Sequence, residues 1–218
     1  MKCLQFFWLI GFIICSSHGI AQPFIEEIRE FKKQDQIHPP PKDPILFAGS
    51  SSFRIWTNVN EAFPGYPILN RGFGGSTFPD LIYYAKDIIY PYHPKQVVIY
   101  CGDNDLAFSD SITADTVFEH FKVLFDMIRA NLPAENIVFI SIKPSPSRAR
   151  LREKMEKANL LIQTFLSVQT HTSFVDVFHK MLKPDGSVMT DIFKEDNLHM
   201  NAKGYAIWQK AIASYLSK

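Results

Sequence analysis

The segment Gln96–Asp105, QVVIYCGDND, decides the fold class, because an uninterrupted apolar run ends abruptly in a polar turn. A short, β-branched apolar run without polar alternation is typical of a strand buried on both faces of a parallel sheet. Similar runs recur on either side of it, separated by longer stretches of helical periodicity. This alternation predicts a parallel sheet covered by helices. The predicted strands are Ile45–Gly49, Pro67–Arg71, Gln96–Cys101, Asn136–Ile142 and Ser173–Val177.

Helical segments are predicted between and after these strands. Apolar residues recur at helical spacing from Val117 to Ile128, and strong helix formers fill Arg148–Gln169. Near the C-terminus, Asn201 is a candidate N-cap for a helix that carries apolar residues from Tyr205 to Tyr215. Ligands of open α/β sheets bind beyond the carboxyl ends of the strands, so the polar residues that follow each strand are the candidates for a site.

The N-terminus has the pattern of a signal peptide. Lys2 precedes a nearly continuous apolar run over Leu4–Cys15, and small residues precede a predicted cleavage site after Ala21. The apolar run is shorter than the about 20 residues that a spanning helix needs. We therefore expect an exported protein, periplasmic or extracellular, with residues 22–218 as a single domain and no stable membrane insertion after removal of the leader.

Composition narrows the function classes. Removal of residues 1–21 from the 218-residue chain leaves 197 residues, enough for one well-buried core. The remaining basic and acidic side chains balance, so nothing indicates a nucleic-acid partner. Only Cys101 remains outside the leader, and its place at the end of an apolar run indicates a buried strand residue. Cys and His spacing gives no indication of a structural metal.

A serine stands where the first predicted strand turns toward a helical segment, within Gly49–Ser52. Such a turn exposes the hydroxyl of Ser51 above the sheet, and free amides at a helix start can donate to an oxyanion. The same pattern is also common in plain turns and helix caps.

Two further turns follow predicted strands. Asn70–Thr77 contains three glycines, which let backbone amides approach a ligand closely, although a tight connection explains the glycines equally well. In the turn after the third strand, Asn104 could stabilise an oxyanion because its amide donates two N–H groups without carrying charge. An Asx-type turn capped by Asp103 or Asp105 is the alternative.

An acid and an imidazole stand three residues apart in Asp196–His199, just before the last helix. A carboxylate on Nδ1–H fixes the imidazole tautomer, so that Nε2 can take a proton from a serine hydroxyl. We interpret the other histidines after the leader as surface or packing residues: His38, His93, His120, His171 and His179.

Two other sets of polar residues are weaker candidates. The segment Lys143–Arg148 should border the cleft and shape a substrate pocket, or form a rigid loop before the next helix. Arg54 and Arg71 could bind an acidic substrate group, although surface or capping roles are the more frequent ones for arginine.

Four of these segments together, in this order, resemble the motif blocks of the SGNH/GDSL hydrolase family: Gly49–Ser51, Asn70–Gly75, Gly102–Asp105 and Asp196–His199. The resemblance implies a three-layer α/β/α flavodoxin-like fold with a five-stranded parallel sheet. It also implies a catalytic triad of Ser51, Asp196 and His199. The implied oxyanion donors are the amides of Ser51 and Gly75 and the side chain of Asn104. Ser50 replaces the aspartate of the family motif.

The implied function is hydrolysis of carboxylic esters through an acyl-enzyme, without a cofactor or a metal. We expect small acyl groups, such as acetyl, on glycans or soluble esters. The alternatives within the family are a lysophospholipase or a thioesterase. Two other classes remain: a non-catalytic glycan-binding domain, and a metal-dependent hydrolase that uses Asp103, Asp105, Asp196 and His199 as ligands.

Overall fold

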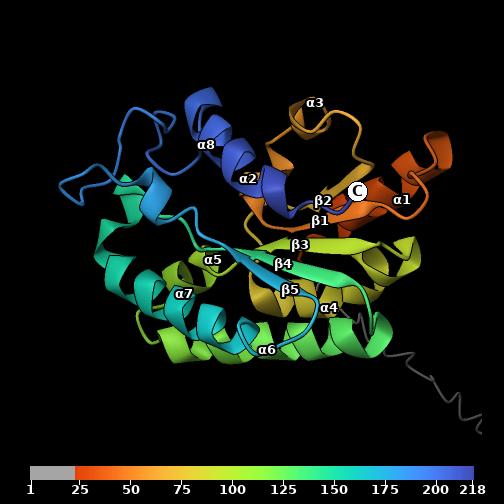
Figure 1. Ribbon diagram of the computed structural model, residues 1–218, viewed down its shortest axis with the longest axis horizontal. Helices are drawn as coiled ribbons and strands as arrows, with labels where there is room; N and C mark the ends of the chain where they lie inside the picture. Colours follow the sequence, from red (N-terminus) through yellow and green to blue (C-terminus); the bar gives the residue numbers. More distant parts are fainter. Residues whose placement is uncertain (1–22) are drawn as a thin grey trace, which may run out of the picture.

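The computed structural model describes residues 23–218, which form a five-stranded, all-parallel sheet between two layers of helices (Figure 1). The strand order is β2-β1-β3-β4-β5. The strands are β1 (Ile45–Gly49), β2 (Ile68–Gly72), β3 (Gln96–Tyr100), β4 (Asn136–Ile140) and β5 (Thr172–Val175). This architecture confirms the predicted α/β fold, and each predicted strand lies within two residues of its observed ends. The predicted leader, residues 1–21, lies outside the described residues.

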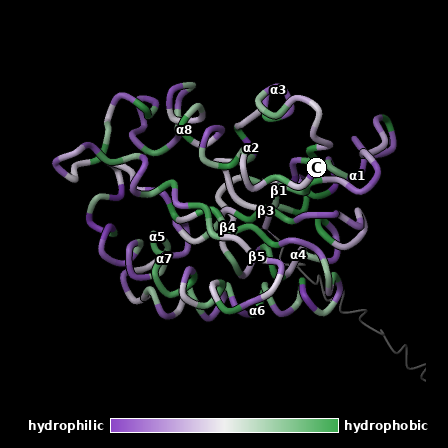
Figure 2. The backbone as a smooth tube through the Cα atoms, in the orientation of Figure 1, coloured by the Kyte–Doolittle hydropathy of each residue, from purple (hydrophilic) through white to green (hydrophobic). Residues whose placement is uncertain are grey.

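The sheet holds the centre of the molecule because its inner strands are apolar on both faces. Every residue of β1 and β3 is buried, and alternate side chains enter different cores. Leu46 and Ile99 pack into one core, whereas Phe47 and Tyr100 pack into the other. Figure 2 shows the apolar strands in the middle and polar residues on the outer helices and loops.

One helical layer covers the first core. Its helices are α4 (Phe78–Ile88), α6 (Ala114–Asn131) and α7 (Arg152–Leu166), and α1 (Ile25–Ile37) adds Ile28 to the same core. The helix α5 (Asp103–Phe108) follows β3 directly. No helix among the described residues is long and apolar enough to span a membrane.

The second core lies under three other helices: α2 (Ser51–Arg54), α3 (Val59–Ala62) and α8 (Ala202–Ile212). Trp208 of α8 packs edge-on against Tyr100 and Phe53, with ring centroids 4.7 and 6.2 Å apart. Because Phe53 belongs to α2, this aromatic cluster fixes α8 next to the turn that carries Ser51.

The helix boundaries differ from the prediction at one place that concerns the site. Arg148 was expected to begin a long helix, but Pro146–Leu151 forms a 3₁₀ segment, η2, and α7 begins only at Arg152. Within η2, Arg148 has a φ of −117°, outside the helical region. The remaining 3₁₀ segments are η1 (Tyr90–Tyr92), η3 (His179–Met181) and η4 (Ala213–Tyr215).

Candidate active site

The turn after β1 carries Ser51 to the carboxyl edge of the sheet. The Ser50 N–H donates to the Tyr100 carbonyl at 3.1 Å, and the Ser50 carbonyl then accepts from Phe53 N–H at 2.9 Å. The chain therefore passes from the strand into α2 without a loop, and Ser51 is the first helical residue. The Ser50 side chain is buried, and its hydroxyl makes no hydrogen bond within residues 23–218.

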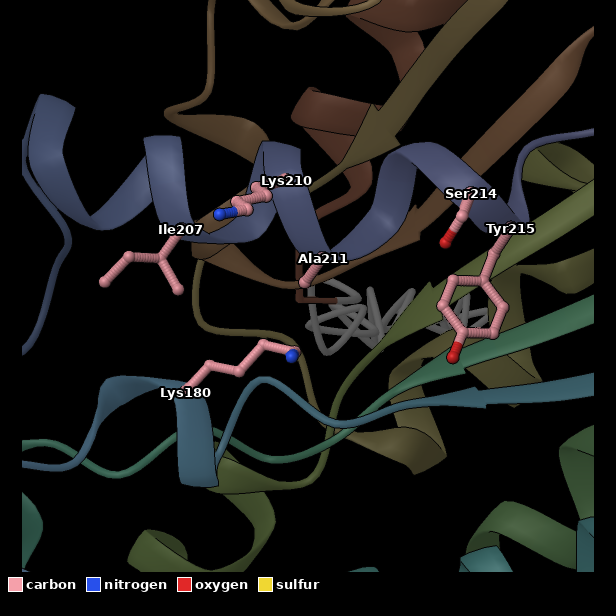
Figure 3. Close-up of a pocket in the computed structure, with 6 residues that line it drawn as sticks. All are labelled: Lys180, Ile207, Lys210, Ala211, Ser214 and Tyr215. Atoms are coloured by element: carbon pink, nitrogen blue, oxygen red, sulfur yellow. The ribbon is translucent and has the colours of Figure 1, made fainter. Parts of the chain in front are cut away.

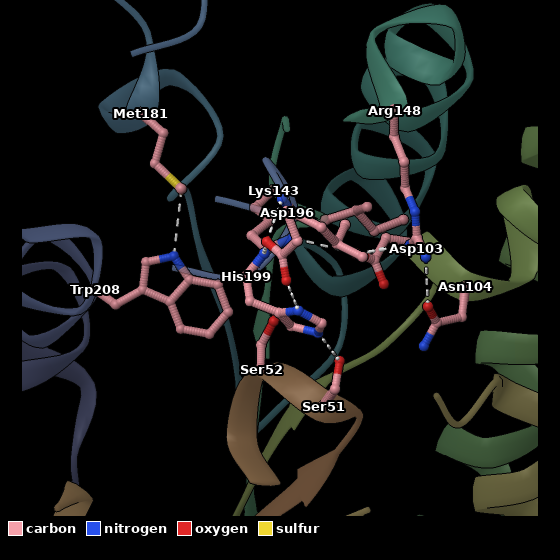
Figure 4. Close-up of polar contacts among 12 residues, drawn as sticks. Ser51, Ser52, Asp103, Asn104, Lys143, Arg148, Met181, Asp196, His199 and Trp208 are labelled. Atoms are coloured by element: carbon pink, nitrogen blue, oxygen red, sulfur yellow. Dashed lines mark hydrogen bonds and ion pairs between the residues drawn. The ribbon is translucent and has the colours of Figure 1, made fainter. Parts of the chain in front are cut away.

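The loop before α8 brings His199 to the serine (Figure 4). The Ser51 hydroxyl lies 3.0 Å from Nε2 of His199, and Nδ1 of the same ring lies 2.6 Å from Oδ2 of Asp196. The structure thus brings the three residues of the predicted triad into one hydrogen-bonded chain, with serine and histidine 148 positions apart in the sequence. Neither Ser50 nor Ser52 makes this contact with the imidazole.

The acid is held by its own loop. Oδ1 of Asp196 accepts hydrogen bonds from the Leu198 and His199 N–H groups, both at 2.9 Å. Partial burial opposes ionisation of Asp196, but these bonds and the His199 ring lower its pKa to about 2. The carboxylate is therefore charged at neutral pH and can stabilise a protonated imidazole.

Asn201 closes this loop at the start of α8. Its side-chain oxygen accepts from Lys203 N–H at 2.9 Å, as predicted for an N-cap. Its Nδ2 donates to the carbonyls of Asp191 and Phe193, both at 2.9 Å. One side chain thus ties both ends of the loop that carries Asp196 and His199.

The two other predicted oxyanion donors lie at the same edge. Gly75 has a φ of +77°, which favours glycine, and a side chain there would meet no atom within 4 Å. The Asn104 amide donates to the Ser76 carbonyl at 2.9 Å, and its oxygen accepts from Arg148 at 2.8 Å. In Figure 4, Asn104 lies on the side of Ser51 opposite Trp208.

The carboxylates considered as metal ligands have separate partners. Asp103 pairs with Lys143 and Arg148, whereas Asp105 accepts from Phe78 N–H at the start of α4, at 3.0 and 3.2 Å. Within the described part of the chain, no group of three or more His, Cys, Asp or Glu side chains could hold a metal ion.

The interpretation of the two arginines needs correction for Arg71. This side chain is buried, pairs with Asp35 of α1, and stacks on the rings of Phe31 and Tyr92 at 5.0 and 4.7 Å. Its guanidinium therefore joins α1 to β2 and is already paired with a carboxylate of the same chain. Arg54 is half-exposed and lies 3.7 Å from Glu27.

Sequence reasoning overlooked a second acid–imidazole pair. Asp176 precedes His179 by three residues, and their side chains lie 2.7 Å apart, in the same arrangement as Asp196 and His199. The spacing was visible in the sequence. However, within residues 23–218 the His179 ring makes no hydrogen bond with a serine, and three-quarters of its side chain is exposed.

Two cavities differ in their relation to the site. A cavity of about 430 Å³, lined mainly by apolar atoms, has Gly75 in its wall, together with Phe24, Phe108 and Ile112. A cavity of about 470 Å³ lies between α8 and η3 and is lined by Lys180, Lys210 and four neighbours, none of them from the predicted triad (Figure 3).

Comparison with known proteins identifies the family. Residues 44–207 match the GDSL-like lipase/acylhydrolase family. The chain belongs to this family. Membership confirms the resemblance noted in the sequence and makes the protein a hydrolase of ester bonds.

Individual proteins that resemble this chain have low sequence identity to it. Subunit alpha2 of platelet-activating factor acetylhydrolase IB from Rattus norvegicus is 27% identical over 175 residues, 76% of this chain and 72% of the relative. A GDSL-like lipase from Bacteroides thetaiotaomicron superposes with a TM-score of 0.71 at 18% identity, covering 86% of this chain and 96% of that one. An acetylxylan esterase from Geobacillus stearothermophilus superposes with a TM-score of 0.65 at 16% sequence identity, covering 79% of this chain and 93% of that one.

Proposed function

We propose that the protein is an exported serine esterase in which Ser51, His199 and Asp196 form the catalytic triad. The observation that carries the proposal is the continuous contact from the Ser51 hydroxyl through both ring nitrogens of His199 to Asp196. Family membership supplies the reaction class. The arrangement is suited to nucleophilic catalysis because the base reaches the nucleophile and the acid orients the base.

The reaction proceeds in two steps. His199 Nε2 takes the hydroxyl proton as Ser51 Oγ attacks the ester carbonyl, and the resulting imidazolium returns that proton to the departing alkoxide. Water then attacks the acyl-enzyme with the same base, releasing the acid and regenerating Ser51. The negative oxygen of each tetrahedral intermediate is stabilised by the amides of Ser51 and Gly75 and by the side chain of Asn104.

The substrate we favour is a small acyl ester, such as an acetyl group, on a glycan or a soluble alcohol. Two relatives support it by name: one is an acetylhydrolase subunit and one an acetylxylan esterase. A predicted leader at residues 1–21 supports export and hence contact with extracytoplasmic glycans. N-terminal sequencing of the secreted or periplasmic protein should find Gln22; retention of Met1 would contradict export by cleavage.

A lysophospholipase or thioesterase activity is the second candidate, favoured by the apolar cavity beside Gly75. Its volume of about 430 Å³ exceeds what an acetyl group occupies and lies in the range of ligand sites. A longer acyl chain placed there would bury apolar surface against Phe24, Phe108 and Ile112.

The triad is tested by labelling the protein with a fluorophosphonate and by hydrolysis of aryl esters. Ser51→Ala should lose both labelling and activity, whereas Ser50→Ala, which removes a hydroxyl without a hydrogen bond in the described structure, should keep them. Loss in both variants, or in neither, would contradict the assignment of Ser51. A protein that binds acetylated glycans without being labelled would be the non-catalytic alternative.

The substrate class is tested by a series of acyl lengths. The ratio of kcat/KM for acetyl and octanoyl esters of one alcohol separates the two candidates. A ratio above one supports the small acyl group, and a ratio well below one supports the long-chain alternative. Acetylated polysaccharides and lysophospholipids then identify the alcohol part.

A further inference from the structure

The Asn104 side chain has two polar neighbours that accept only one orientation of its amide. Nδ2 donates to the Ser76 carbonyl at 2.9 Å, and Oδ1 accepts from a guanidinium nitrogen of Arg148 at 2.8 Å. A flipped amide would place its oxygen against the Ser76 carbonyl and its NH₂ group against the guanidinium, with acceptor facing acceptor and donor facing donor. The two neighbours together keep the NH₂ group on one side.

The guanidinium of Arg148 is itself held by an ion pair with Asp103. A second nitrogen of Arg148 lies 3.0 Å from Oδ2 of Asp103, and the same oxygen accepts from Lys143 at 3.3 Å. The side chains of Lys143 and Asp103 are only 1% and 5% exposed, and that of Arg148 16%. Burial opposes ionisation of Asp103, but the two neighbouring cations lower its pKa below the ordinary value. The acid therefore stays charged and holds the arginine in place.

Two basic side chains, Lys143 and Arg148, thus share the single carboxylate of Asp103. Since the charged guanidinium of Arg148 donates to Oδ1 of Asn104, this hydrogen bond is charge-assisted and polarises the amide, which makes its NH₂ group a stronger donor.

The loop that carries Arg148 reaches the other side of the site as well. The Ser147 N–H donates to the Asn197 carbonyl at 3.1 Å, inside the loop of Asp196 and His199. The 3₁₀ segment η2 thus contacts both the acid loop, through Ser147, and the predicted oxyanion donor, through Arg148. Figure 4 shows the contact between Arg148 and Asn104. The backbone of Arg148 is non-helical, so these contacts depend on the 3₁₀ segment and not on a regular helix that begins at Arg148.

We propose that Arg148 is a positioning residue for ester hydrolysis: anchored on Asp103, it fixes and polarises the Asn104 amide so that its NH₂ group faces the oxyanion. The proposal rests on the proposed serine esterase function. Arg148 acts through Asn104 and touches no reacting atom.

A double-mutant cycle on the full-length protein tests the proposal. Arg148→Met, Asn104→Ala and the double variant are compared with wild type on one acetyl aryl ester, with rates normalised to Ser51 titrated by fluorophosphonate. Asn104→Ala should lower kcat by about 10²–10³. Arg148→Met should lower kcat by about tenfold to a hundredfold, the worth of one hydrogen bond to a charged group, with KM changed less than threefold. In the Asn104→Ala background, Arg148→Met should have no further effect on kcat.

Arg150→Met is the matched control, because Arg150 lies two residues away and makes only an exposed ion pair with Asp110. Its kcat should equal that of wild type. If Arg148→Met does not fold, Arg148→Lys replaces it in the same cycle, since lysine keeps the charge beside Asp103 but has one terminal nitrogen instead of two.

The outcomes separate the two proposals. A wild-type protein without Ser51-dependent turnover would refute the esterase function itself. An active wild type whose Arg148→Met variant keeps its kcat would leave the function standing and refute the positioning by Arg148. The same conclusion would follow if Arg148→Met lowered kcat as much in the Asn104→Ala background as in the wild-type background.

Discussion

At the scale of single residues, Asp196 and Asp176 provide a natural internal comparison. Each stands three residues before a histidine and contacts Nδ1 of that ring, at 2.6 and 2.7 Å. Only His199 also contacts a serine hydroxyl in the described structure. A carboxylate that orients an imidazole should therefore matter for activity in the first pair alone.

We predict that Asp196→Asn lowers kcat/KM by about 10²–10⁴, because an amide in place of the carboxylate no longer fixes the tautomer or stabilises the imidazolium. Asp176→Asn should leave kcat/KM within about twofold of wild type. Steady-state kinetics on an acetyl aryl ester measure both. An equal loss in the two variants would mean that the acid–imidazole spacing, and not the serine contact, governs activity.

The sequence was sufficient to single out the candidate site residues that stand in short motifs. Ser51, Gly75, Asn104 and His199 could be singled out because each follows a strand or precedes a helix within a recognisable block. Arg148 was expected only within a segment, Lys143–Arg148, that borders the cleft. Its contacts with Asp103 and Asn104 could not be predicted, because they span more than 40 positions and depend on a non-helical turn.

At the scale of elements, the apolar strands were predictable because burial on both faces removes every polar position from the pattern. The helix α1 was not predicted, and it is mostly polar, with Ile28 its only fully buried residue. The contacts that hold α1 to the sheet include the buried pair of Arg71 and Asp35, residues 36 positions apart. Local sequence periodicity cannot predict such a contact, because it joins residues that are far apart in the chain.

The cap of α8 gives a prediction at this scale. Asn201→Ala removes an N-cap and two bonds that close the loop of Asp196 and His199. We expect the free energy of unfolding to fall by about 1–3 kcal/mol. We also expect kcat to fall, because the freed loop holds His199 less firmly. Urea denaturation and kinetics check both effects.

Asn58 offers the control for that variant. It precedes α3, but its side chain makes no capping bond, so Asn58→Ala should change stability by less than about 0.5 kcal/mol. Equal stability losses in the two alanine variants would show that the Asn201 side chain does not stabilise the loop as the contacts indicate.

At the scale of the whole molecule, one buried carboxyl links folding to pH. Burial raises the pKa of Asp105 to about 7, although the Phe78 N–H stabilises its charged form. Asp103 and Asp80 repel the charge further, and His120 of α6 faces it at 3.7 Å. Below pH 4 the carboxyl is protonated in both the folded and the unfolded chain. Between about pH 4 and 7 the unfolded chain releases this proton while the folded protein retains it.

The folded state therefore binds more protons than the unfolded state in this window, and stability must fall as pH rises. The difference between the folded and unfolded pKa values corresponds to a loss of at most about 4 kcal/mol in the free energy of unfolding, and this loss is complete above about pH 7.

Asp105→Asn should remove this component, because the side-chain oxygen of asparagine still accepts from Phe78 N–H but the amide cannot ionise. We predict that Asp105→Asn gains stability relative to wild type from pH 4 to 7.5, whereas Asp126→Asn, on the exposed face of α6, shows no such trend. Urea denaturation at several pH values measures the difference. A wild-type-minus-variant difference that stays constant across this range would show that Asp105 is ionised in the folded protein well below pH 7, and that the contacts at the start of α4 stabilise a buried charge.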